Sequence, residues 1–468
     1  MKRFVIIVKS TIIVIICLYF MGYVIKHYDG KEYGFNQIND YVTKMCKVAD
    51  TPGMSVAVLN DEQEYYINAG YENKDTKTKA TSETKYELGS TTKAFTALGI
   101  LLLEQDGMLD RNDSVSKYIP WFAPSFNGGT VEMTIEQLLC HTSGIPAWTI
   151  ANLPIGTIND DGLLEETISM IKDMKLDNHP GKVYNYATIN YDVLALIIER
   201  VTNTTYEEYI EKSILEPLGM YNSYFRVDNS KKSQLAQGYH YAFQVAEKYE
   251  APTFYGNTAA GYLVSNTKDL MIWMKAQSGL FEINMTESLE KIKNAIMESH
   301  LYPIKSGKHY WAGWNLYHSY FFHTGNNPNF SSHVIIDRDE TKAVFALTNI
   351  SGSAAAVTAD GIYRILHGEN IKIGFFVDET SLVDLFCTIL CFVELYVGII
   401  LWEKKNRIRT YAIVKASISL LLAILIAVFP YALHYNYLTL AIWYSPSLLV
   451  AAVGGVICLL RYAVKCAV

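Results

Sequence analysis

Four long apolar runs constrain this chain more than any other feature of its sequence. A helix of about 20 apolar residues crosses the ~30 Å hydrocarbon core of a bilayer, and each run is long enough to do so. One run occupies residues 4–25, and three more lie near the C-terminus at 382–402, 411–433 and 438–460. The sequence therefore predicts four membrane spans. We favour an uncleaved anchor over a secretory signal for the first, because Gly22 is the only small residue near its end.

The positive charges that flank these runs predict their orientation, because Lys and Arg beside membrane spans are retained in the cytoplasm. They precede the first run, connect the second to the third, and follow the fourth: Lys2, Arg3, Lys404, Lys405, Arg407, Arg409, Arg461 and Lys465. We therefore expect a multi-pass protein of the cell membrane with both termini in the cytoplasm. The chain then divides into an N-terminal anchor or signal (1–27), an extracytoplasmic domain (28–380) and a three-helix transmembrane domain (381–468).

Two charged residues lie inside the predicted spans, Glu394 in the second and Lys415 in the third. Charged groups within a bilayer are costly and usually pair or line a functional cavity. Three interpretations stay open: an ion pair within the bundle, a role in binding substrate or lipid, or no special role. In the last case Lys415 would extend towards the cytoplasm and Glu394 would be protonated.

Composition excludes several classes of function. The net charge is −7 and no run of Lys and Arg is longer than two, so nucleic acid is not an expected partner. Of seven cysteines, only Cys46 and Cys140 lie away from the apolar runs, which is too few for a disulfide scaffold. We do not favour a bridge between those two. No Cys-x-x-Cys or His-x-x-x-His spacing indicates a metal site, and we expect no cofactor.

The external segment begins with strand-like alternation from Pro52, followed by the short apolar stretch KYELG and the helical pattern AFTALGILLLEQ. Ser90 falls at this strand-to-helix junction, with Lys93 one turn further along. A hydroxyl there experiences the positive end of the helix dipole and has an amine beside it. The arrangement predicts a nucleophile with a neighbouring base.

The Ser-x-x-Lys pattern alone is weak evidence, because it occurs six times in this chain. The other five lack the combination of a preceding strand, a glycine just before the serine and a long apolar helix just after: Ser82, Ser114, Ser169, Ser265 and Ser288. The local context therefore selects Ser90.

Two further motifs follow in order, Tyr186-Ala-Thr188 before an apolar helix and His323-Thr324-Gly325 at an apolar strand. With Ser90-Thr-Thr-Lys93 they resemble the serine hydrolases of the class C β-lactamase and D-Ala-D-Ala peptidase superfamily. Three supporting stretches extend the resemblance along the external domain, at 138–146, 216–220 and 259–270. The layout of one N-terminal and three C-terminal spans is similar to that of the staphylococcal Flp and FmtA-like group, and to that of membrane-bound prodrug-maturing peptidases.

The resemblance implies an α/β fold of the β-lactamase and penicillin-binding-protein type, in which helices flank an antiparallel sheet and a helical subdomain forms the other wall of the cleft. It implies that Ser90 attacks and that Lys93 and Tyr186 supply the base, with Lys93 lowering the pKa of Tyr186. The backbone N–H groups of Ser90 and Asn326 would form an oxyanion hole. The stretch 323–325 would align the acyl part of the substrate by strand-like pairing.

Two residues depart from the usual pattern of this superfamily. Thr188 replaces an Asn, which puts substrate positioning in doubt. His323 stands where β-lactamases more commonly have Lys, and a mostly neutral imidazole attracts a carboxylate less strongly. We therefore do not expect efficient β-lactam hydrolysis. For His141, in the stretch HTSG, we expect a structural role in a turn near the site.

Other interpretations of single residues stay open at this stage. Tyr186 could be an ordinary core tyrosine, and His323 a structural histidine. Three literal Tyr-x-Asn sequences elsewhere in the chain lack the following helix and the required order: Tyr66, Tyr71 and Tyr255.

The sequence thus favours a membrane-anchored extracytoplasmic serine hydrolase that acts through a Ser acyl-enzyme. Its substrate would be an amide or ester: a D-amino-acid peptide, a D-alanyl ester of the cell envelope or an exported prodrug. One alternative is a penicillin-binding-type protein that acylates with little turnover. Another is a transporter or immunity protein whose bundle carries the function, although three C-terminal spans without an internal repeat are untypical of transporters. The expected partners are this small substrate and the lipid bilayer.

Overall fold

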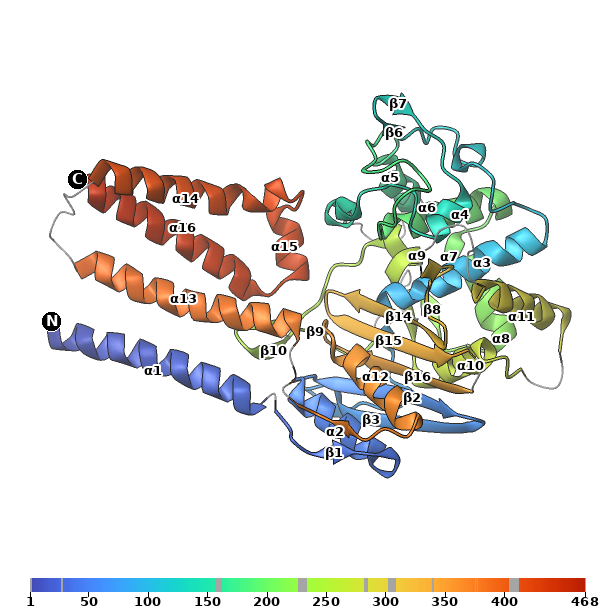
Figure 1. Ribbon diagram of the computed structural model, residues 1–468, viewed down its shortest axis with the longest axis horizontal. Helices are drawn as coiled ribbons and strands as arrows, with labels where there is room; N and C mark the ends of the chain where they lie inside the picture. Colours follow the sequence, from blue (N-terminus) through green and yellow to red (C-terminus); the bar gives the residue numbers. More distant parts are fainter. Residues whose placement is uncertain are drawn as a thin grey trace.

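The computed structural model describes residues 2–26, 28–155, 162–225, 234–281, 285–301, 309–338, 341–374, 376, 378–403 and 412–467. Figure 1 shows two parts: a mixed α/β domain and, beside it, a layer of long helices that contains both ends of the chain. The stretch 404–410, to which four of the orienting charges belong, lies outside the described residues.

An antiparallel sheet of eight strands forms the centre of the α/β domain, in the order β12-β13-β14-β15-β16-β2-β3-β4. The strands are β2 (Gly53–Asn60), β3 (Gln63–Asn73), β4 (Thr78–Lys79), β12 (Tyr310–Trp311), β13 (Trp314–Leu316), β14 (Tyr320–Asn327), β15 (Phe330–Asp337) and β16 (Lys342–Thr348). Strand β16 pairs with β2 along their full lengths, from Lys342 opposite Asn60 to Thr348 opposite Met54. The sheet therefore joins the early hairpin to strands almost 300 residues later in the sequence.

Helices cover both faces of this sheet (Figure 1). Helices α2 (Ile38–Val48) and α12 (Ala354–Leu366) pack on one face and share an apolar core with it. Helix α10 (Thr267–Gln277) packs on the other face, towards the helical region.

Helix α3 (Lys93–Gln105) is central to the helical region, and its residues 93–103 are all buried. A helix with apolar residues all around its axis is stable only where neighbours cover every side. The neighbours are α6 (Ile189–Thr202), α7 (Tyr206–Ile210), α9 (Thr258–Gly261) and α11 (Glu287–Ser299). The expected antiparallel sheet flanked by helices, with a helical region beside it, is confirmed.

Within the described part of the chain, three helices are long and apolar enough to cross a membrane, by length and composition. They are α13 (Glu379–Glu403), α14 (Ala412–Ala432) and α16 (Pro446–Ala467). The N-terminal helix α1 (Lys2–Lys26) lies beside α13, where the rings of Tyr19 and Phe392 are 5.7 Å apart. Its apolar part as described, Ser10–Lys26, is shorter than the other three. The fourth crossing stays a prediction.

The last apolar run was expected to form one span over 438–460, and this is wrong. It breaks at Tyr444 and Ser445 into a short helix, α15 (Tyr437–Trp443), and α16. Pro446 explains the break, because proline disfavours helical geometry in the residue before it and suits the first turn of a new helix. Helix α15 docks on the α/β domain: the Thr439 hydroxyl donates to the carbonyl of Ala151 at 2.6 Å.

The two charged residues of the predicted spans are not partners. Among the described residues, no ion pair joins Glu394 to Lys415. The Glu394 carboxylate lies instead against α16, where it occupies the space that side chains at Gly454 and Gly455 would need. The ion-pair interpretation is therefore wrong for this structure, and Glu394 packs between helices.

Candidate active site

Ser90 lies in a short 3-10 turn, η2 (Gly89–Thr92), between strand β5 (Tyr86–Glu87) and helix α3. The turn requires glycine before the serine: Gly89 has φ +55°, and a side chain there would meet the backbone nitrogen of Asn326 at 2.6 Å. Behind the turn, the carbonyl of Leu88 accepts hydrogen bonds from the hydroxyls of Thr91 at 2.9 Å and Ser332 at 2.5 Å. Ser90 is thus held at the strand-to-helix junction that the sequence predicts.

Lys93 begins α3, and its side chain is completely buried beside Ser90. Its Nζ lies 3.0 Å from Oγ of Ser90, 3.1 Å from Oγ1 of Thr188 and 2.7 Å from the carbonyl oxygen of Ala260. Burial lowers the pKa of Lys93 below its ordinary value, and the nearby Asp192 opposes this shift. A neutral amine, which can accept the Ser90 proton, is therefore more accessible than in an exposed lysine.

Asp192 is a buried carboxyl on α6 that the sequence analysis missed. Its Oδ2 accepts a hydrogen bond from the side-chain amide of Asn257 at 2.6 Å. Burial raises the pKa of Asp192, and the charge of Lys93 acts in the opposite direction. An aspartate directly before the apolar stretch VLALII was the signal that could have indicated a buried acid.

Tyr186 precedes α6 and is half-buried at the site. Its ring centroid lies 5.2 Å from Nζ of Lys93 and 4.1 Å from the ring of His141. Burial raises the pKa of Tyr186 above its ordinary value, and a hydrogen bond with the Ser90 hydroxyl only partly opposes this. The sequence-based expectation that Lys93 lowers the pKa of Tyr186 is therefore wrong in direction, because desolvation dominates.

His141 supports the segment that carries Tyr186. It is fully buried, and its Nδ1 accepts hydrogen bonds from the Asn190 side chain at 3.0 Å and from the backbone N–H of Ala187 at 3.3 Å. The imidazole also packs against the ring of Tyr310, with centroids 4.7 Å apart. This geometry has the structural character expected for His141.

Strand β14 brings the third motif to Ser90. Its pairing with β13 ends at Phe322, so the following residues face η2 instead of another strand. A side chain at Gly325 would collide with the carbonyl of Leu88 and lie 2.9 Å from the backbone nitrogen of Ser90. Only glycine allows this approach. The structure therefore brings together the backbone at Ser90 and Asn326, as an oxyanion hole requires.

The side chain of His323 is used within the protein. It is 3% exposed, its Nδ1 lies 2.8 Å from the carbonyl oxygen of Thr324, and its Nε2 lies 3.1 Å from the phenol oxygen of Tyr310. Burial, together with the charge of Lys93, lowers the pKa of His323 to about 3. The imidazole is therefore neutral, and both of its nitrogens have hydrogen-bond partners within the protein, Tyr310 and Thr324. The predicted contact between this side chain and the substrate does not fit that geometry.

Thr324 and Thr188 have different positions relative to the cleft. The Thr324 hydroxyl bonds to Nδ1 of His333 on the neighbouring strand at 2.8 Å, and the residue lines a cavity. Thr188 is buried, and its hydroxyl keeps the contact with Lys93. The substitution of Asn by Thr therefore leaves a partner for the lysine.

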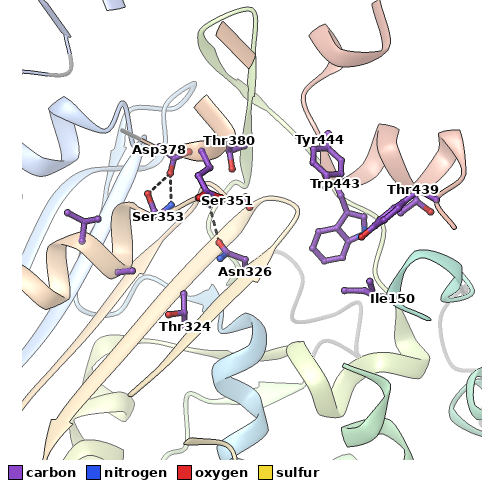
Figure 2. Close-up of a pocket in the computed structure, with 15 residues that line it drawn as sticks. Ile150, Thr324, Asn326, Ser351, Ser353, Asp378, Thr380, Thr439, Trp443 and Tyr444 are labelled. Carbon is purple, nitrogen blue, oxygen red and sulfur yellow. Dashed lines mark hydrogen bonds between the residues drawn. The ribbon is translucent and has the colours of Figure 1, made fainter. Parts of the chain in front are cut away.

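A cavity of about 530 Å³ extends from β14 towards the apolar helices. Figure 2 shows Thr324 and Asn326 on one side and Trp443 and Tyr444 on the other.

Among the described residues, no group of three or more His, Cys, Asp or Glu is arranged to hold a metal, and Cys46 and Cys140 are both free thiols.

Comparison with known proteins agrees with this geometry. The sequence profile of the family described as "Beta-lactamase" matches residues 38–369. The chain belongs to the β-lactamase family. The family membership that the sequence motifs implied is therefore confirmed.

The chain is similar to curated proteins, but each match covers only part of the other protein's length. "Protein flp" of Staphylococcus aureus (strain MRSA252) is 33% identical over 326 residues, which cover 67% of this chain and 63% of that protein. A "Beta-lactamase" of Providencia stuartii is 26% identical over 253 residues, 53% of this chain and 59% of that protein. The chain thus spans less than two thirds of the length of these relatives.

Two solved structures are similar to this chain in fold. The octameric penicillin-binding protein homologue from Pyrococcus abyssi has a TM-score of 0.60 and 28% identity, and the match covers 71% of this chain and 77% of that one. A class C β-lactamase has a TM-score of 0.60 at 21% identity, covering 71% and 95%.

Proposed function

We propose that this chain is a membrane-anchored, extracytoplasmic serine hydrolase that forms an acyl-enzyme at Ser90. Its substrates are amides or esters: D-amino-acid peptides, D-alanyl esters or exported prodrugs. The observation that carries the proposal is the 3.0 Å contact between Nζ of Lys93 and Oγ of Ser90 in a site that excludes water from the lysine.

The chemistry assigns one task to each group. Neutral Lys93 accepts the Ser90 proton as Oγ attacks the substrate carbonyl carbon. The N–H groups of Ser90 and Asn326 stabilise the oxyanion that forms. Protonated Tyr186 then donates a proton to the leaving nitrogen or oxygen and regains one from Lys93, and the C–N or C–O bond breaks. Water attacks the Ser90 ester by the same route in reverse, which releases the acid and restores the serine.

The electrostatics of β14 favour substrates other than β-lactams. A side chain with a pKa near 3 is neutral at physiological pH, so His323 supplies no positive charge to attract a carboxylate. This supports amides or esters whose recognition does not depend on a free carboxylate at that position.

The arrangement of the helices supports an extracytoplasmic site. Both described ends of the chain lie at the end of the helical layer remote from the α/β domain (Figure 1). Together with the flanking Lys and Arg residues, this supports cytoplasmic termini and a catalytic domain on the other side of the membrane.

Labelling intact membranes with a fluorophosphonate probe tests the proposal. We expect strong labelling that is lost in Ser90→Ala. Turnover assays with D-amino-acid esters and amides follow. One burst of product without steady release would show that the protein acylates with little turnover, which is the penicillin-binding-type alternative. If folded native protein does not label, Ser90 is not an activated nucleophile and the proposal is wrong.

A further inference from the structure

The cavity beside the active site is bounded by the membrane-proximal helices as well as by the α/β domain. Its catalytic side consists of Thr324 and Asn326 of β14, and the backbone of Asn326 lies against Gly89, the residue before Ser90. Its opposite side includes Thr439, Trp443 and Tyr444, which belong to α15 and the break after it (Figure 2).

A second cavity, of about 420 Å³, lies among α14, α15 and α16. Its walls are apolar side chains and tyrosine rings, among them Phe429, Tyr435, Leu440, Tyr444, Leu448 and Ala452. Because most of these residues belong to helices long and apolar enough to cross a bilayer, a polar group placed here would lose its hydration without gaining partners. Hydrocarbon is the chemistry that fits this space.

Tyr435 and Tyr444 line both cavities. The two cavities are therefore neighbours that share these two side chains as a common wall, one lying towards the β14 edge and the other in the helical layer. The first cavity has polar groups along its walls, such as Ser351, Ser353 and Thr380, whereas the second has few. This change from polar to apolar matches a molecule with a polar head and a hydrocarbon tail.

The wall between the cavities is fixed to the catalytic domain. The carbonyl of Ala151 accepts hydrogen bonds from Thr439 at 2.6 Å and from the Asn436 side chain at 3.4 Å. The Tyr249 hydroxyl donates to the carbonyl of Ile442 at 3.1 Å. Helix α15, which carries part of the wall of each cavity, is thus held in a fixed position against the catalytic domain.

We propose that the substrate is an amphiphile whose scissile carbonyl binds at Ser90 and whose long hydrocarbon tail lies in the cavity between α14 and α16. This inference rests on the proposed hydrolase function and names its substrate class. The tail then selects membrane-borne substrates, which approach the site from the outer surface of the bilayer.

Chain-length selectivity of the full-length protein in nanodiscs tests the inference. The rates for p-nitrophenyl palmitate and p-nitrophenyl butyrate are compared in the native protein and in Ala452→Phe, which fills the cavity. We expect the ratio of palmitate to butyrate rates to fall about tenfold in Ala452→Phe. Val453→Phe is the matched control: Val453 is the next residue on α16, is 57% exposed and does not line the cavity, so the native ratio should persist. Equal ratios in all three proteins would overturn the inference.

A second measurement does not depend on hydrolysis. Ser90→Ala protein is irradiated with a C16 amide that has a diazirine at the end of its chain, and the adducts are mapped by mass spectrometry. We expect adducts on the cavity walls of α14 and α16. An excess of unlabelled C16 amide should prevent these adducts from forming, whereas an excess of C4 amide should not. Adducts spread over all lipid-facing surfaces, or competed equally by phospholipid, would assign the cavity to bilayer lipid and overturn the inference. Because this arm needs no nucleophile, its result stays informative if the hydrolase proposal itself fails.

Discussion

The phenol of Tyr310 donates a hydrogen bond to Nε2 of His323 over 3.1 Å, where water is excluded. The direction follows from the other nitrogen: Nδ1 lies 2.8 Å from the Thr324 carbonyl, which can only accept, so the proton of the neutral ring is there. This pair joins the short strand β12 to β14 behind the candidate active site.

Tyr310→Phe should destabilise the protein. The substitution leaves Nε2 of His323 buried without a donor, which costs about 1–3 kcal/mol in the free energy of unfolding. Thermal or denaturant unfolding of the solubilised protein measures this. Tyr317→Phe, at a partly exposed ring, is the control and should change stability by less than about 0.5 kcal/mol. Equal effects of the two substitutions would show that the hydrogen bond has no net value.

The pH dependence should report the Lys93 amine. Because the reaction needs neutral Lys93, kcat/KM should rise as pH rises through the lowered pKa of this residue, well below the ordinary value for lysine. Asp192 opposes that lowering, so Asp192→Asn should move the rise to still lower pH. The pH profiles of the two proteins measure this shift. An unchanged profile, or one moved to higher pH, would contradict the assignment of Lys93.

Gly325→Ala should reduce activity by about 10²-fold or more. Its added methyl would press on the backbone of Leu88 and Ser90 and widen the space between the two oxyanion donors. The readout is kcat for any ester that the native protein turns over, with labelling of Ser90 as a second measure. Gly374→Ala is the control, since nothing lies within 4 Å of that position. Native activity in Gly325→Ala would mean that β14 does not form the oxyanion hole.

Changing the charged residues of the helical layer should leave the nucleophile intact. Glu394 packs against Gly454 and Gly455 on α16, within the helical layer, and Lys415 lies on α14. Glu394→Gln and Lys415→Met should therefore keep fluorophosphonate labelling of Ser90. If these substitutions abolished the cellular function while Ser90→Ala did not, a bundle-based activity such as transport would replace hydrolysis.

Features encoded in neighbouring residues were predictable from the sequence. Ser90 and Lys93 are one helical turn apart, so their approach follows from the helix itself. The hairpin of β2 and β3 follows from alternation in a continuous stretch. The strand-to-helix junction follows from the change of period at Gly89.

Features that depend on distant contacts were not predictable in this way. The burial of His323 follows from Tyr310, which is 13 residues away and belongs to a two-residue strand with little pattern of its own. The effect of Asp192 on Lys93 depends on the packing of α6 against α3, which no local pattern encodes. Desolvation of Tyr186 likewise depends on its neighbours in space, and this reversed the expected direction of its pKa shift.

The central claim is that Ser90 becomes acylated during turnover. The most direct measurement is the intact mass of the full-length protein, quenched in acid during reaction with p-nitrophenyl butyrate, followed by peptide mapping of the adduct. The account predicts a single butyryl adduct on Ser90 that is absent in Ser90→Ala and forms much more slowly in Lys93→Met. Turnover without any adduct on Ser90, or with the adduct on another residue, would contradict it.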